Sequence, residues 1–192
     1  MLPASRSCSS TDRTLATTPS SSPFQRKVAH CAVYTGLSQT LIKITSPGVP
    51  DFYQGGELWD LNLVDPDNRR PVDYDRRKAF LKDIKARVEK GTAPLIGELL
   101  STKEDGRIKL YLIHRALKVR RENPVLFREG DYVPLDTAGP FKDHVMAFAR
   151  RREGKWAAFY ANKCVIPVTC PSGSCQTSLS NALSGRGGDH AA

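Results

Sequence analysis

Hydrophobic residues recur at helical spacing in three stretches of the chain. They are, in chain order, Leu37, Leu41 and Ile44, then Phe80, Leu81, Ile84 and Val88, and finally Leu110, Ile113 and Leu117. Such spacing places the apolar side chains on one face of a helix. Residues that disfavour helices follow each stretch, at 46–48, at Gly91 and at Asn123-Pro124. The pattern therefore predicts three helices that end near these positions.

A short apolar and aromatic run, residues 49–53, follows the first predicted helix and leads into Gly55 and Gly56. This pattern is typical of a strand that is followed by a glycine-rich loop. A helix, a strand and a loop in this order form the repeating unit of an α/β barrel. A long polar loop is predicted to follow, from Glu57 to Tyr74.

Three segments after Pro124, at 132–135, 144–149 and 155–161, are rich in residues that favour strands. Residues 151–154 predict a hairpin turn between the last two. We therefore expect a small antiparallel β domain at 124–162, with Trp156 and Phe159 in its core. The cluster of Arg150, Arg151 and Arg152 is interpreted as part of a solvated turn rather than as a phosphate clamp.

The two ends of the chain differ from the rest in composition. Residues 1–22 are half Ser and Thr, and residues 163–192 contain Thr, Ser, Gly and Cys with almost no periodic apolar signal. We predict that 1–22 is a disordered or non-native leader and that 163–192 is a disordered or out-of-frame tail.

Composition narrows the classes of function. Lys and Arg outnumber Asp and Glu by 29 to 20 among 192 residues, so binding to a polyanion has to be considered. The basic residues are scattered through mixed-charge segments, which argues against nucleic acid. The five cysteines show no zinc-finger spacing and are interpreted as free thiols, and no apolar run is long enough to span a bilayer.

Residues 46–73 combine carboxylates, amides, guanidinium groups and aromatic rings, and buried polar groups of this kind need partners. Sugars suit such a set, because their hydroxyls pair with polar side chains while the apolar ring face packs on Tyr or Trp. The candidates are Tyr53, Gln54, Glu57, Trp59, Asp60, Asp65, Asp67, Asn68, Arg69, Arg70 and Asp73. The same residue types equally allow a plain tight turn at 65–68, with Arg69 and Arg70 paired to nearby carboxylates.

Residues 46–74 resemble the signature stretch of the maltooligosyl trehalose synthases, and residues 47–57 resemble the α-amylase superfamily at its eighth barrel strand. The resemblance extends back to about Pro23 and forward to about Trp156. It implies a fold of the class α/β plus β. Residues 23–123 would hold the last strand and helix part of a (β/α)8 TIM barrel, the sugar-site loop and the helices that follow it, and the small antiparallel β domain would come next.

This resemblance implies an intramolecular transglycosylation, in which the reducing-end α-1,4 bond of a maltooligosaccharide becomes an α,α-1,1 bond. The process retains configuration and needs a carboxylate nucleophile and a second carboxyl as acid and base. In the family these groups lie on earlier barrel strands, so no catalytic residue is expected here and the chain is predicted to be inactive alone. A cytoplasmic location and no metal or organic cofactor are also implied, and a separately encoded barrel portion is left open as a partner.

The loop after the presumed last strand lies where barrel enzymes build their sites. The residues expected to face or shape the substrate site are Tyr53, Gln54, Glu57, Asp67, Asn68, Arg69 and Arg70. Arg69 and Arg70 fit the role of ion-pair struts equally well. The alternative function is a noncatalytic glucan-binding module, in which an exposed Trp156 would contact the glucan.

An isolated strand with its flanking helix cannot close a barrel. We therefore expect residues 24–60 to be poorly packed or aggregation-prone in isolation, with Leu37, Leu41 and Ile44 losing most of their burial.

Overall fold

The computed structural model describes residues 23–60 and 69–162. Its elements are α1 (Pro23–Thr45), α2 (Tyr74–Lys90), α3 (Thr92–Ser101), η2 (Lys103–Asp105), α4 (Arg107–Glu122), α5 (Pro124–Glu129), β1 (Asp131–Leu135), η3 (Lys142–His144), β2 (Val145–Arg152) and β3 (Lys155–Asn162). The three predicted helices are α1, α2 and α4, and the three strands predicted after Pro124 are β1, β2 and β3. The pattern did not predict α3 and α5, which are short.

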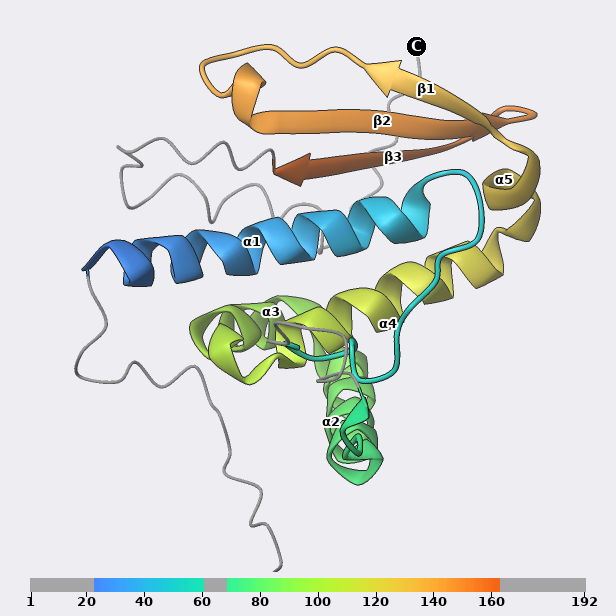
Figure 1. Ribbon diagram of the computed structural model, residues 1–192. Coiled ribbons are helices and arrows are strands. Elements are labelled where there is room, and N and C mark those ends of the chain that lie inside the picture. The colour runs from blue at the N-terminus through green and yellow to red at the C-terminus, as the bar shows by residue number, and fades with distance from the viewer. Residues whose placement is uncertain (1–22, 61–68, 163–192) are drawn as a thin grey trace, which may run out of the picture.

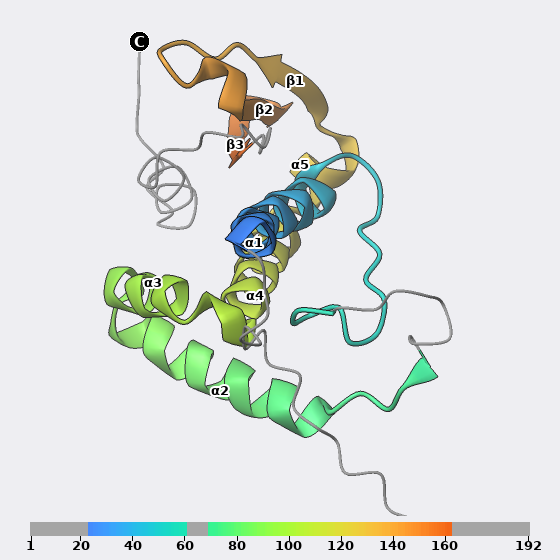
Figure 2. The same ribbon diagram turned by 60° about the vertical axis from the view of Figure 1, so that its left-hand side comes forward.

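The five α-helices named above all lie on one side of a three-stranded sheet of order β1-β2-β3 (Figure 1). Helix α1 runs directly beneath β3 and, on its other side, packs on α4. Helices α2 and α3 contact α4 and lie farther from the sheet (Figure 2). The described chain is therefore layered as sheet, α1, α4, and then the pair α2 and α3.

Helix α1 is well packed. Leu37 and Ile44 are fully buried, and Leu37 belongs to a hydrophobic cluster that also contains Ile84, Leu99 and Ile108 from the other helices. The expectation that residues 24–60 would be poorly packed is wrong for α1. The reason is that α4 on one side and β3 on the other bury its apolar faces without any barrel neighbour.

Residues 49–53 are not a strand, which corrects the prediction from their composition. Val49 is 93% exposed, and no described strand lies alongside this segment to accept and donate its backbone hydrogen bonds. The guanidinium of Arg120 binds the preceding backbone instead, donating to Ile44 O at 2.6 Å, to Ser46 O at 3.3 Å and to Gly48 O. No part of a TIM barrel is recognisable in the described residues.

Arg150 is buried at 1% exposure, so the interpretation of Arg150 as part of a solvated turn is wrong. It pairs with Tyr132 of β1 and Ala157 of β3 in the middle of the sheet. Its guanidinium donates to Gly130 O at 2.7 Å, to Phe127 O at 3.0 Å and to Thr45 O at 3.5 Å. Burial lowers the pKa of this guanidinium, and the charge of Arg120 lowers it further. Arg150 thereby joins the sheet to the ends of α1 and α5.

The aromatic residues of β3 point to opposite faces of the sheet, as alternation along a strand requires. Phe159 faces the helices, where its ring lies 5.4 Å from that of Phe148 and 5.9 Å from that of Phe127. Trp156 lies on the other face and is 55% exposed. The prediction that Trp156 is a core residue is therefore wrong.

Candidate functional site

Tyr53 and Gln54 lie on an exposed tight turn that two glycines make possible. Gly56 N donates to Tyr53 O at 3.0 Å, and a Cβ on Gly56 would meet that oxygen at 2.9 Å. Gly55 has a φ of 88°, in the region that side chains rarely adopt. Tyr53 is 55% exposed and Gln54 is exposed as well. The turn therefore presents both side chains to the surroundings.

Glu57 closes this turn onto helix α2. Its Oε2 accepts a hydrogen bond from Arg77 Nε at 3.0 Å in a half-buried ion pair. The same guanidinium donates to Gly55 O at 2.8 Å and to Asp73 O at 2.9 Å. Because one planar group binds three acceptors, it fixes the turn and the start of α2 in one geometry. Glu57 acts here as a strut for the turn that carries Tyr53.

Two further contacts hold the end of the loop against the helical layer. Trp59 Nε1 donates to Lys103 O at 2.6 Å, and Lys109 Nζ donates to Leu58 O at 3.2 Å. The Lys109 ammonium also lies 5.6 Å from the Trp59 ring centroid. Burial lowers the pKa of Lys109, while the charges of Asp60 and Glu57 oppose that shift.

Two glycines far apart in the sequence make room for this arrangement. A Cβ on Gly36 of α1 would lie 3.4 Å from the Trp59 ring, and one on Gly106 would lie 3.1 Å from Trp59 N. Gly106 also has a φ of 83°, and it precedes α4. A side chain at Gly106 would therefore crowd the loop backbone in a strained conformation, whereas a Cβ at Gly36 would make an ordinary contact with the Trp59 ring.

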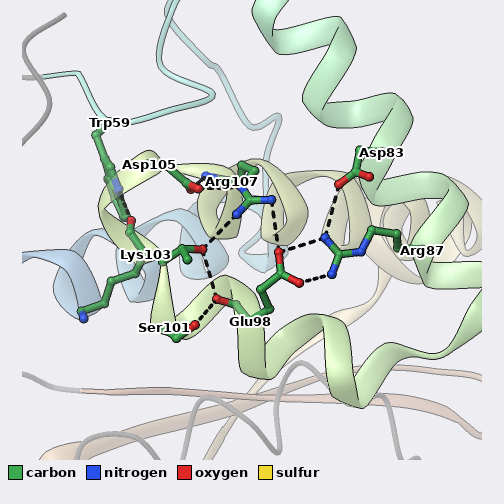
Figure 3. Close-up of polar contacts among 9 residues, drawn as sticks. Trp59, Asp83, Arg87, Glu98, Ser101, Lys103, Asp105 and Arg107 are labelled. Atoms are coloured by element: carbon green, nitrogen blue, oxygen red, sulfur yellow. Dashed lines mark hydrogen bonds and ion pairs between the residues drawn. The ribbon is translucent and has the colours of Figure 1, made fainter.

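An ion-pair network braces the helices behind the loop (Figure 3). Glu98 of α3 is bound by Arg87 of α2 through both guanidinium nitrogens and by Arg107 of α4 at 3.4 Å. Arg107 also donates to Asp105 at 2.6 Å and to Thr102 Oγ1 at 3.0 Å. The hydrogen bonds from Arg87 lower the pKa of Glu98. Lys103, whose carbonyl accepts the hydrogen bond from Trp59, lies in η2 between α3 and α4. The ion pairs between these helices therefore hold Lys103, and with it the loop, in place.

The structure brings together three of the predicted site residues, Tyr53, Gln54 and Glu57, on one turn. Arg69 and Arg70 are exposed and lie just before α2. Asp67 and Asn68 lie outside the described residues. The sequence analysis missed Arg77 and Lys109, which are 20 and 51 residues from their partners on the loop. Arg77 belongs to the first turn of α2, and no spacing rule connects it to Glu57.

The part of the chain that the structure describes contains no group of three or more His, Cys, Asp and Glu side chains arranged to hold a metal ion. None of the described helices combines the length and apolarity that a membrane-crossing segment needs. Cys31 lies on α1 at intermediate exposure.

Comparison with known proteins gives a relationship over most of the chain. No protein-family model matches. Two Mycobacterium tuberculosis proteins, from strains CDC 1551 / Oshkosh and H37Rv, are named as maltooligosyl trehalose synthases and are each 41% identical over 135 residues. The match covers 69% of this chain and 15% of each relative. The chain therefore spans only a small part of the length of these relatives.

Solved structures give the same result. A crystal structure of maltooligosyl trehalose synthase matches with a TM-score of 0.54 and 35% identity, covering 66% of this chain and 16% of the other. A mutant of maltooligosyltrehalose synthase from Arthrobacter ramosus matches with a TM-score of 0.52 and 34% identity over the same shares. The resemblance predicted from residues 46–74 is thus confirmed by sequence and by structure.

Proposed function

We propose that this chain, a homologue of one segment of the maltooligosyl trehalose synthases, is the C-terminal section of such an enzyme and depends on the remaining sections for activity. The observation that carries the proposal is the asymmetry of the match, which covers 69% of this chain but 15% of the relatives. A segment that matches so small a share of the relatives is proposed to supply only part of a site.

The reaction that the relatives' name indicates converts the reducing-end α-1,4 bond of a maltooligosaccharide into an α,α-1,1 bond. Retention of configuration requires two carboxyl groups about 5 Å apart, one as nucleophile and one as acid and base. The Glu57 carboxylate accepts a hydrogen bond from Arg77 and so stabilises the turn. We therefore assign no catalytic residue to this chain and propose that the rest of the enzyme supplies both carboxyl groups.

The role proposed for this chain is to hold one rim of the glucan site. Tyr53 offers a ring face for a pyranose, and Gln54 offers an amide that both donates to and accepts from sugar hydroxyls. Glu57 and Arg77 position the turn without touching the sugar. Asp67, Asn68, Arg69 and Arg70 are proposed as the second polar flank of the same rim.

A complementation assay tests this function. The chain alone is incubated with maltohexaose, and then together with a maltooligosyl trehalose synthase truncated to remove the matching segment. Loss of reducing ends without release of glucose measures the reaction. We expect no loss with either component alone and a restored loss with both. Activity of the chain alone, or a soluble mixture that binds but stays inactive, would contradict the proposal.

A pair of variants tests the rim. Tyr53→Ala is expected to raise the KM of the complemented enzyme by about tenfold, which is the loss of about 1.4 kcal/mol of binding. Tyr74→Ala, at an exposed tyrosine that starts α2, is the matched control and should leave KM unchanged. Equal effects of the two variants would remove Tyr53 from the site.

A further inference from the structure

The sheet face that points away from the helices carries two exposed aromatic side chains on one strand. Trp156 is 55% exposed and Tyr160 is 50% exposed. They are four residues apart on β3, so their positions along the strand are separated by about 13 Å. Both alternate with Ala157, Phe159 and Ala161, and Phe159 packs toward Phe127 of α5 on the helical side. The two rings therefore share the outer face.

Small side chains separate the two rings. Ala158 lies between them on β3, and its partner across the sheet is Ala149, while the partner of Tyr160 is Ala147. Ala147 and Ala149 are buried. We call the surface formed by Trp156, Ala158 and Tyr160, all exposed, the aromatic strip. A large ring lies at each end of it with one small side chain between them, and it runs along an edge strand of the sheet.

The charges beside the aromatic strip favour a neutral ligand. Arg151 pairs with Trp156 across the sheet, and its guanidinium lies 5.1 Å from the indole centroid. The same guanidinium forms an ion pair of 3.6 Å with Asp131 of β1, which neutralises it. The N–H groups of Arg151 beside the indole ring can donate to hydroxyl groups. A polyanion would gain little here, because the guanidinium already forms an ion pair with Asp131.

The area of the aromatic strip also separates the ligand classes. A stable protein interface buries about 800 Å² on each partner. Two half-exposed rings and one exposed alanine offer much less than that. A glucan needs less area, because each sugar ring packs its apolar face on one aromatic side chain while its hydroxyls stay in water.

We propose that the aromatic strip is a binding surface for an α-1,4-glucan chain, separate from the turn that carries Tyr53. Trp156 and Tyr160 each pack against a sugar ring, the small side chain of Ala158 lets the chain pass between them, and Arg151 donates to a hydroxyl beside Trp156. The strip lies beyond α1 and the sheet from the loop at residues 53–60 (Figure 1). The identity of the glucan rests on the proposed function, whereas the arrangement of the rings does not.

Intrinsic fluorescence tests the proposal on the full chain. The chain has two tryptophans, and Trp59 is already held by Lys103 O. Titration with maltoheptaose is expected to shift the emission of Trp156 to shorter wavelength, because its exposed ring becomes covered. Trp156→Phe keeps a ring and should retain binding in affinity electrophoresis through amylopectin while losing the fluorescence shift. Tyr160→Ala should weaken binding by about tenfold.

Controls distinguish this site from the others. Phe141→Ala removes a ring that is as exposed as Trp156 but lies outside the aromatic strip, and it should bind like the unaltered chain. Tyr53→Ala should leave the shift in Trp156 emission unchanged, so the proposed function can fail while the strip binds glucan. The proposal is overturned by an equal shift with cellohexaose, by no shift in a folded sample, or by a shift that follows protein concentration, which would assign the strip to a second copy.

Discussion

Arg150 is the residue whose environment departs most from the sequence pattern. It is 1% exposed and binds three backbone carbonyls, yet no carboxylate contacts its guanidinium in the described part of the chain. A buried cation without a counter-ion depends on every one of its hydrogen bonds. Its burial is possible because Thr45 and Phe127 lie in the last turns of α1 and α5, where helical carbonyls have no intrahelical partner, and Gly130 directly follows α5.

Arg150→Lys is expected to lower the free energy of unfolding by about 1–3 kcal/mol, because one ammonium group cannot reach three carbonyls in different directions. Urea denaturation followed by circular dichroism measures the change. Arg151→Lys, at the exposed neighbouring position, is the control and should change stability by less than about 0.5 kcal/mol. Similar losses for the two variants would show that the guanidinium geometry at Arg150 is unimportant.

The carboxyl group of Glu98 affects how stable the protein is in acid. Hydrogen bonds from Arg87 hold its pKa below the ordinary value, with Arg107 adding to the shift. A depressed carboxyl pKa contributes stability that is present above the unfolded pKa of about 4.3 and is lost as pH falls through the folded pKa. We therefore expect the melting temperature of Glu98→Gln to fall less than that of the unaltered chain when the pH is lowered from about 5 to about 3, the range in which carboxyl groups titrate. Glu89→Gln, exposed on α2, should keep the full decline.

At the scale of elements, the candidate rim is a loop whose shape is set by the helices that follow it. Arg77 of α2 binds Gly55 O and Glu57, Lys103 O binds Trp59, and Lys109 of α4 binds Leu58 O. A loop fixed at this many points keeps its conformation without a sheet beneath it. This is the physical reason why residues 53–60 are ordered even though residues 49–53 form no strand.

Arg77→Met should release this loop. The loss of its charge-assisted hydrogen bonds, each worth about 1.5–3 kcal/mol, is expected to speed amide exchange at residues 55–58 by about 10- to 100-fold. Hydrogen exchange measured by mass spectrometry or NMR gives the rates. Lys78→Met removes the next cation on α2, which makes only an exposed ion pair with Asp75, and should leave the rates unchanged. Unchanged exchange in Arg77→Met would mean that the other anchors suffice.

For the whole molecule, the question is whether the sheet and the helices unfold together. The division into segments 23–123 and 124–162 stays a prediction. Helix α1 contacts β3, and Arg150 of β2 binds Thr45 O at the end of α1. We expect that this shared core makes α1 and β2 exchange their most protected amides with the same free energy, as one cooperative unit. Much faster exchange in β2 than in α1 would instead support the division at residue 124.

The sequence by itself determined the elements whose signals are local. Apolar spacing around Leu37, Ile84 and Ile113 is sufficient for helices, because residues three and four apart share a face, and residues 151–154 are sufficient for a hairpin. The resemblance of residues 46–74 to the signature stretch of the maltooligosyl trehalose synthases was enough to point to the relatives that the comparisons found. A local signal of this kind needs no knowledge of distant residues.

Only the tertiary structure decided the rest, because it depends on contacts between residues far apart in the chain. Residues 49–53 have strand-forming composition but no neighbouring strand to pair with, so they are not a strand. Arg150 is charged yet buried, since three carbonyls from separate elements meet around it. Glu57 stabilises the turn because Arg77 of α2 forms an ion pair with it. Trp156 is exposed because the helices pack on the opposite face of the sheet. None of these outcomes has a signature in spacing or composition, since each is set by which surfaces meet when the helices and the sheet assemble.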